Sequence, residues 1–275
     1  MYFQEYLVLL RGGGDLATGV AYRLHKAGFP LIVTELPRPL VVRRTVALAT
    51  AVHEGEVAIE DLHARRATSP TDAEEIAYST GSIPVIAAPD LAPLISNFQS
   101  PVSILVDARM AKRNIDTEKD QAPLVIALGP GFTAGVDCHA VIETMRGHRL
   151  GRVIWEGSAL PNTGTPGIVA GKGRERVLRA PTSGVVRWQV SIGDLVETGE
   201  TLGQVANEPV TAPFAGVVRG LITPGTAVWD GLKIGDVDAR GDPAACTQIS
   251  DKALAIGGGV LEAVLTWLNR DARGD

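Results

Sequence analysis

Long hydrophobic runs and excess positive charge are both missing from this chain, and each absence excludes a class of protein. A membrane-spanning helix needs roughly 18 or more consecutive apolar residues, and the sequence contains no such run. The net charge of −5 and the isoelectric point near 5.6 leave no basic excess of the kind that binds nucleic acid. We therefore expect neither a membrane nor a nucleic acid as a partner.

Cysteine is also scarce, occurring only at Cys138 and Cys246. Two distant cysteines without C-x-x-C spacing exclude a disulfide framework and the usual zinc sites, so no metal site is predicted from them. This usage suits a reducing compartment, and the chain begins without a signal peptide, so we expect a cytoplasmic protein. Cys138 is either a nucleophile or a small buried hydrophobe, and the second role is the commoner one for a free cysteine.

The composition that remains is that of a globular protein with two domains. Hydrophobic residues make up 45% of the 275 residues and charged residues 21%. Over the first 120 residues, short apolar runs at 6–10, 31–34, 84–87 and 103–106 alternate with helical patterns. Strands that alternate with helices predict a mostly parallel sheet, which binds ligands at the carboxyl ends of its strands.

The first of these runs leads into a glycine turn, a helix and a second strand. This order matches a dinucleotide-binding unit, in which glycines let backbone amides approach a pyrophosphate and an acid some 20 residues later holds a ribose. We predict nucleotide contacts here. The alternative is that Asp15 only caps the helix and the glycines only form a tight turn. The predicted contacts are Gly12, Gly13, Gly14, Asp15 and Glu35.

Charged residues follow the strand at 103–106. Asp107 and Arg109 lie at its expected carboxyl end, where a cation and an acid can hold a phosphate group. The alternative is a solvated loop with ordinary surface charge.

The densest group of reactive side chains follows the run 123–128 and a Gly129-Pro130-Gly131-Phe132 turn. Asp137, His139 and Glu143 occur within seven residues, and alternation places His139 and Glu143 on one face of a predicted hairpin. They are the candidates for proton transfer, and Gly129 and Gly131 for contacts to a cofactor. The alternative for each is a structural, hydrogen-bonded residue.

The C-terminal half contains an internal repeat with an offset of 32 residues. Residues 180–205 and 212–237 share 11 identities in 26 positions, including the segments Ala-Pro-x-x-Gly-Val-Val-Arg. Short valine-rich segments between glycine turns predict strands. This part resembles the biotinyl/lipoyl-like barrel-sandwich hybrid, a family that carries its prosthetic group on a lysine. The matching hairpin at 206–211 contains no lysine, so we expect neither biotin nor lipoate.

Several long motifs occur in the same order as in one known family. They are Arg-Gly-Gly-Gly-Asp-Leu-Ala-Thr-Gly from Arg11, Asp-Ala-Arg-Met from Asp107, Gly-Pro-Gly-Phe from Gly129 and His-Ala-Val-Ile-Glu-Thr from His139. In these motifs the chain resembles the YqeB family of the selenium-dependent molybdenum hydroxylase system. The resemblance implies a pathway and not a reaction.

The resemblance and the motifs together predict an accessory or maturation protein for a selenium-dependent molybdenum hydroxylase. Its ligand would be a nucleotide or a molybdenum-cofactor dinucleotide, and its partner the hydroxylase itself. Two other functions stay open: an NAD-linked oxidoreductase with His139 as acid/base, or a non-catalytic docking protein. Whether the protein is an enzyme is left open, and a homo-oligomer is compatible with the sequence.

The predicted fold class is α/β, with a Rossmann-like parallel sheet domain followed by a small all-β barrel-sandwich hybrid. Its expected parts are an α/β domain at 1–122, the Gly-Pro-Gly-Phe motif with a hairpin at 123–175, the β domain at 176–245, and a helix at 246–275. We expect that helix to pack back on the first domain, with its glycine run allowing close approach.

Overall fold

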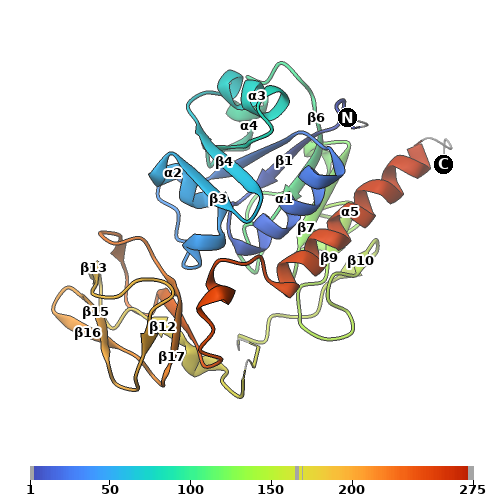
Figure 1. Ribbon diagram of the computed structural model, residues 1–275. Helices are drawn as coiled ribbons and strands as arrows, with labels where there is room; N and C mark the ends of the chain where they lie inside the picture. The colour runs from blue at the N-terminus through green and yellow to red at the C-terminus, as the bar shows by residue number, and fades with distance from the viewer. Residues whose placement is uncertain (1–2, 165–166, 169, 272–275) are drawn as a thin grey trace. The chain divides into compact units, whose positions relative to one another are not determined.

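The computed structural model describes residues 3–164, 167–168 and 170–271 (Figure 1). It consists of two compact units, neither of which is continuous in sequence. The first contains Met1–Pro39, Leu48–Asn162 and Ile249–Asp275, and the second contains Leu40–Ala47 and Thr163–Gln248.

A nine-stranded sheet forms the centre of the first unit, with the order β10-β9-β7-β6-β1-β2-β5-β4-β3. The neighbours from β9 to β4 are parallel, whereas β10 and β3 pair antiparallel at the two edges. The strands are β1 (Leu7–Arg11), β2 (Leu31–Glu35), β3 (Glu56–Ile59), β4 (Leu62–Ala67), β5 (Ile83–Ala87), β6 (Val102–Asp107), β7 (Leu124–Leu128), β9 (Ala140–Ile142) and β10 (Val153–Ile154). A separate pair is formed by β8 (Thr133–Ala134) and β11 (Gly157–Ser158).

The apolar runs form the central strands because both faces of the sheet are covered. Every residue of β1 is buried, and Leu7 and Leu9 share a core cluster with residues of α3 (Pro70–Ser79) and α4 (Leu91–Ile95). Side chains alternate across a strand, so Val8 and Leu10 point to the other face. A continuous apolar strand is what a sheet covered on both faces requires.

Two helices, α1 (Asp15–Ala27) and α5 (Asp251–Asp271), pack side by side in this unit (Figure 1). The close approach depends on glycine, because a Cβ on Gly257 would overlap the carbonyl of Gly19. A Cβ on Gly259 would likewise overlap the carbonyl of Gly151. The glycine run that weakens the helical pattern in the sequence therefore lies where α5 contacts its neighbours. A further short helix, α2, spans Ala51–Glu54.

The second unit contains two four-stranded sheets, with the orders β12-β19-β17-β14 and β16-β15-β13-β18. The two copies of the repeat exchange strands, since β14 of the first copy pairs with β17 of the second, and β18 of the second pairs with β13 of the first. The strands are β12 (Val177–Arg179), β13 (Gly184–Trp188), β14 (Leu195–Val196), β15 (Thr201–Val205), β16 (Glu208–Thr211), β17 (Gly216–Leu221), β18 (Ala227–Val228) and β19 (Lys233–Asp238).

The predicted fold class, a Rossmann-like parallel sheet domain followed by a barrel-sandwich hybrid, is wrong. The large sheet has nine strands and is mixed, because an antiparallel strand closes each edge. The repeat is not a self-contained domain at 176–245, since the second unit also takes Leu40–Ala47 from the first half of the chain. The barrel-sandwich resemblance therefore does not describe the architecture.

Candidate functional site

The glycine turn after β1 is packed against the protein itself. Gly12 has a φ of +91°, and a Cβ there would lie 3.1 Å from the Arg109 Cα. A Cβ on Gly13 would lie 2.7 Å from the backbone nitrogen of Ala49, and Gly14 precedes α1 as its N-cap. Gly12 and Gly13 are thus explained by close packing within the first unit.

Glu35, predicted to hold a ribose, is bound to the turn instead. One carboxylate oxygen accepts a hydrogen bond from the Gly13 amide at 2.9 Å, and the other accepts one from the Leu36 amide at 2.7 Å. The Gly12 amide donates to the Thr34 carbonyl at 2.8 Å. Two amides that a pyrophosphate would use are therefore engaged by the protein. Asp15 lies in the first turn of α1.

Asp107 and Arg109 belong to a network of charged side chains at the ends of β1 and β6. The carboxylate of Asp107 accepts hydrogen bonds from Arg109 Nη2 and from Thr117 Oγ1, each at 2.6 Å. Arg11, which is 1% exposed, forms an ion pair with Asp116 at 2.9 Å, and Arg109 pairs with Asp116 at 2.7 Å. The hydrogen bond from Arg11 is the main cause that lowers the pKa of the Asp116 carboxyl. The two guanidinium groups are matched by two carboxylates, so Arg109 does not present an unpaired charge to a phosphate.

Asp137 holds the turn that follows the Gly-Pro-Gly-Phe motif. Its carboxylate accepts hydrogen bonds from the Thr133 amide at 2.6 Å and from the Asn114 side-chain amide at 3.2 Å. The two glycines of the motif have positive φ values, +74° at Gly129 and +108° at Gly131. A Cβ on Gly129 would lie 2.5 Å from Thr144 Oγ1, and a Cβ on Gly131 would lie 2.5 Å from the backbone of Arg113. This part of the predicted site is a rigid turn.

His139 precedes β9 and is fixed by the backbone of β7. Its Nδ1 accepts a hydrogen bond from the Val125 amide at 2.9 Å, while its own amide donates to the Val125 carbonyl at 2.8 Å. Burial lowers the pKa of the imidazole, and the charge of Lys119 lowers it further. The neutral ring with its proton on Nε2 is the form that satisfies this geometry.

Glu143 is 1% exposed, and both of its carboxylate oxygens are bound by backbone. One accepts from the Met145 amide at 2.7 Å and the other from the Leu160 amide at 2.8 Å. His139 and Glu143, predicted to share a face, line two different cavities. Among the described residues no group of three His, Cys, Asp or Glu side chains is arranged to hold a metal ion.

Cys138, next to His139, is fully buried. Burial is the main cause that raises the pKa of its thiol to about 12. A thiol in this environment is not ionised at neutral pH and lacks the nucleophilic form.

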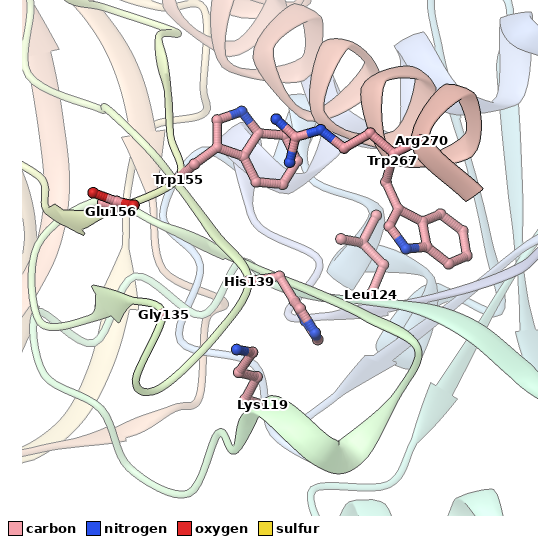
Figure 2. Close-up of a pocket in the computed structure, with 8 residues that line it drawn as sticks. All are labelled: Lys119, Leu124, Gly135, His139, Trp155, Glu156, Trp267 and Arg270. Atoms are coloured by element: carbon pink, nitrogen blue, oxygen red, sulfur yellow. The ribbon is translucent and has the colours of Figure 1, made fainter. Parts of the chain in front are cut away.

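A cavity of about 460 Å³ opens around His139, and we call it the His139 pocket. Its walls come from four separate parts of the first unit (Figure 2). Figure 2 shows the Arg270 side chain against the ring of Trp155, with the guanidinium carbon 4.7 Å from the ring centroid. The lining residues are Lys119, Leu124, Gly135, His139, Trp155, Glu156, Trp267 and Arg270.

Only His139 of this pocket was predicted as a site residue. Trp155 ends the predicted hairpin, and a tryptophan at a strand end gives no signal of a ligand. Trp267 and Arg270 come from α5, more than 100 residues later in the sequence. Only the packing of α5 on the first unit brings them to His139.

No family model matches the chain. A curated relative, "Uncharacterized protein YqeB" of Escherichia coli K12, is 49% identical over 267 residues, which is 97% of this chain. The chain spans about half of that relative, 49% of its length. No helix among the described residues is long and apolar enough to cross a membrane.

Solved structures give only a weak likeness. A succinylglutamate desuccinylase/aspartoacylase from Rhodobacter sphaeroides is 23% identical with a TM-score of 0.22 and coverage of 31% of this chain and 29% of that one. An aspartoacylase family protein from Mesorhizobium loti is 12% identical with a TM-score of 0.27 and coverage of 85% of both chains. Scores this low carry no inference about fold or activity. What the comparisons do show is the relationship that the motifs predicted, since along nearly its whole length the chain is a relative of the YqeB protein.

Proposed function

We propose that this protein is an accessory protein that binds a nucleotide-type ligand in the His139 pocket. The observation that carries the proposal is the combination of two indole rings and two cations around one cavity. Trp155 and Trp267 can stack on a planar base, and Lys119 and Arg270 can bind a phosphate group. The volume of about 460 Å³ falls within the range of roughly 300–1,000 Å³ that small-molecule sites occupy.

The pocket replaces the glycine turn as the proposed place of binding. In the turn, the amides of Gly12 and Gly13 and the carboxylate of Glu35 bind each other or the neighbouring backbone. A pyrophosphate there would have to displace these bonds. In the His139 pocket the described contacts of Lys119 and Arg270 include no ion pair with a carboxylate of the first unit.

The hydrogen bond of His139 argues against a general-base role for this residue. Because Nδ1 accepts from the Val125 amide, the proton of the neutral ring lies on Nε2. A general base needs an unprotonated nitrogen facing the substrate, whereas this ring presents a donor. His139 thus suits a hydrogen bond to an acceptor on the ligand.

The family resemblance supplies the proposed biological setting. A member of the YqeB family would act in the selenium-dependent molybdenum hydroxylase system, with the hydroxylase as its partner. The ligand would then be a nucleotide or the nucleotide part of a molybdenum-cofactor dinucleotide. The two tryptophans and two cations fit that part, which consists of a base and phosphates.

Calorimetric titration with CTP, NAD⁺ and molybdenum cofactor at fixed ionic strength tests the proposal. The double variant Lys119→Ala/Arg270→Ala should weaken binding by at least about tenfold, which corresponds to about 1.4 kcal/mol. Arg187→Ala, an exposed arginine of the second unit, is the matched control and should bind as wild type does. Glu35→Gln should also leave the affinity unchanged. No binding of any of the three ligands to the wild-type protein refutes the proposal.

A further inference from the structure

A second cavity lies beside the β9–β10 hairpin, and we call it the Arg149 pocket. Its volume is about 490 Å³, and several of its lining residues belong to the turn between β9 and β10. Three of its lining side chains are basic, three are aliphatic, and one is a carboxylate. The lining residues are Glu143, His148, Arg149, Arg152, Val153, Ile154, Ser158 and Leu160.

The walls of this pocket are held by the buried carboxylate of Glu143. Its bonds to the amides of Met145 and Leu160 join the two segments that face each other across the cavity. The backbone of Glu143 adds two bonds, accepting from Gly151 at 2.9 Å and donating to the Arg152 carbonyl at 3.0 Å. The turn that carries the basic side chains is therefore fixed before any ligand arrives.

The basic side chains of the pocket outnumber its one carboxylate. Both oxygens of Glu143, the only acid in the lining, accept hydrogen bonds from backbone amides. Within the described part of the chain, neither Arg149 nor Arg152 forms an ion pair. Two guanidinium groups and one imidazole therefore line a single cavity.

We propose that the Arg149 pocket binds the phosphate group of a small organic phosphate. Guanidinium groups form paired hydrogen bonds with phosphate oxygens, and two arginines three positions apart can bind one phosphate from two directions. The aliphatic side chains of Val153, Ile154 and Leu160 supply a surface for the organic part of the molecule. The cavity is larger than one phosphate ion, so the ligand we propose is a phosphate ester or a diphosphate.

This site is separate from the nucleotide pocket proposed above. No residue lines both cavities, and their cations come from different segments of the chain. The two proposals therefore fail independently.

Calorimetry with inorganic pyrophosphate at fixed ionic strength tests the site in the full-length protein. The variant Arg149→Ala/Arg152→Ala should weaken pyrophosphate binding at least about tenfold. Arg187→Ala should bind it as wild type does. Arg149→Lys/Arg152→Lys keeps the charge and should show an intermediate loss, because an ammonium cannot form the paired hydrogen bonds.

Three results would overturn the inference. They are no pyrophosphate binding by the wild-type protein, an equal loss in Arg187→Ala, and a loss confined to Lys119→Ala/Arg270→Ala. Because all substituted arginines of the pocket are exposed, each variant should fold, and its circular dichroism spectrum checks this.

Discussion

The imidazole of His139 accepts a hydrogen bond from the backbone amide of Val125, and the same two residues are joined by a second bond between their main chains. A histidine that uses Nδ1 as an acceptor must lose this bond when that nitrogen is protonated. Burial and the nearby charge of Lys119 act in the same direction and lower the pKa of the ring. His139 is therefore a neutral residue of fixed orientation at neutral pH.

This arrangement predicts how His139 affects stability as the pH changes. The pKa is about 6.5 in the unfolded chain and lower in the folded protein, so below about pH 6.5 the unfolded state binds more protons. The free energy of unfolding should fall as the pH is lowered from neutral through the folded pKa. His139→Asn removes this contribution, and urea titrations at several pH values should show a shallower pH dependence for the variant. An NMR titration that gives His139 a pKa above 6.5 would contradict this explanation.

The network around Arg11 predicts a large difference between two aspartates. Asp107 is 1% exposed and accepts bonds from Arg109 and Thr117, whereas the side chain of Asp116 is 52% exposed. Asp107→Asn removes the buried carboxylate that Arg109 and Thr117 bind, and it should destabilise the protein by about 3–5 kcal/mol.

Asp116→Asn is the matched control for that substitution. The carboxylate of Asp116 is half exposed and water can replace part of its pairing with the buried Arg11, so its loss should cost less, about 1–3 kcal/mol. Chemical denaturation of both variants measures the difference. Equal losses would show that the network does not stabilise the fold through buried charge.

The contact between α1 and α5 predicts opposite effects at neighbouring glycines. A Cβ at Gly257 would overlap the Gly19 carbonyl, so Gly257→Ala should force the helices apart and destabilise the protein by roughly 1–3 kcal/mol. A Cβ at Gly258 meets nothing within 4 Å, and Gly258→Ala should stabilise the helix by roughly 0.5–1 kcal/mol. Thermal unfolding compares the two, and a stable Gly257→Ala variant would argue against this packing.

The two cysteines should be unreactive in the native protein. Cys138 is fully buried with its pKa raised to about 12, and Cys246 is 1% exposed with its pKa also raised by burial. Ellman's reagent at pH 8 should label neither thiol until denaturant is added, after which it should label both. Fast labelling of Cys138 in the native protein would contradict this prediction and support a nucleophilic role for that residue.

The sequence was a good guide to elements whose signals are local. The apolar run at 6–10, the helix predicted after it and the run at 31–34 correspond to β1, α1 and β2. The predicted hairpin corresponds to the antiparallel pair β9 and β10. In each case the signal is the spacing of the apolar side chains and the turn residues beside them. This signal lies within a segment about as long as one helix or strand.

The predictions that were wrong or missing concern contacts between segments that are distant in the sequence. Strands β3 and β4 lie at one edge of the sheet and contain exposed polar positions, so no apolar run marks them, and the antiparallel edge strand β3 was not predicted. The His139 pocket needs Trp267, which a helix at the far end of the chain brings to it. Glu35 and Glu143 were predicted as functional, and the sequence gives no sign that backbone amides bind both carboxylates.

The most direct measurement of the central proposal uses the indole N–H signals of the four tryptophans in a ¹⁵N NMR titration with CTP. Trp155 and Trp267 line the His139 pocket, whereas Trp188 and Trp229 belong to the second unit. We predict that the signals of Trp155 and Trp267 shift in a saturable way while those of Trp188 and Trp229 stay unchanged. Unchanged signals at Trp155 and Trp267, or equal shifts at all four tryptophans, would contradict the proposal.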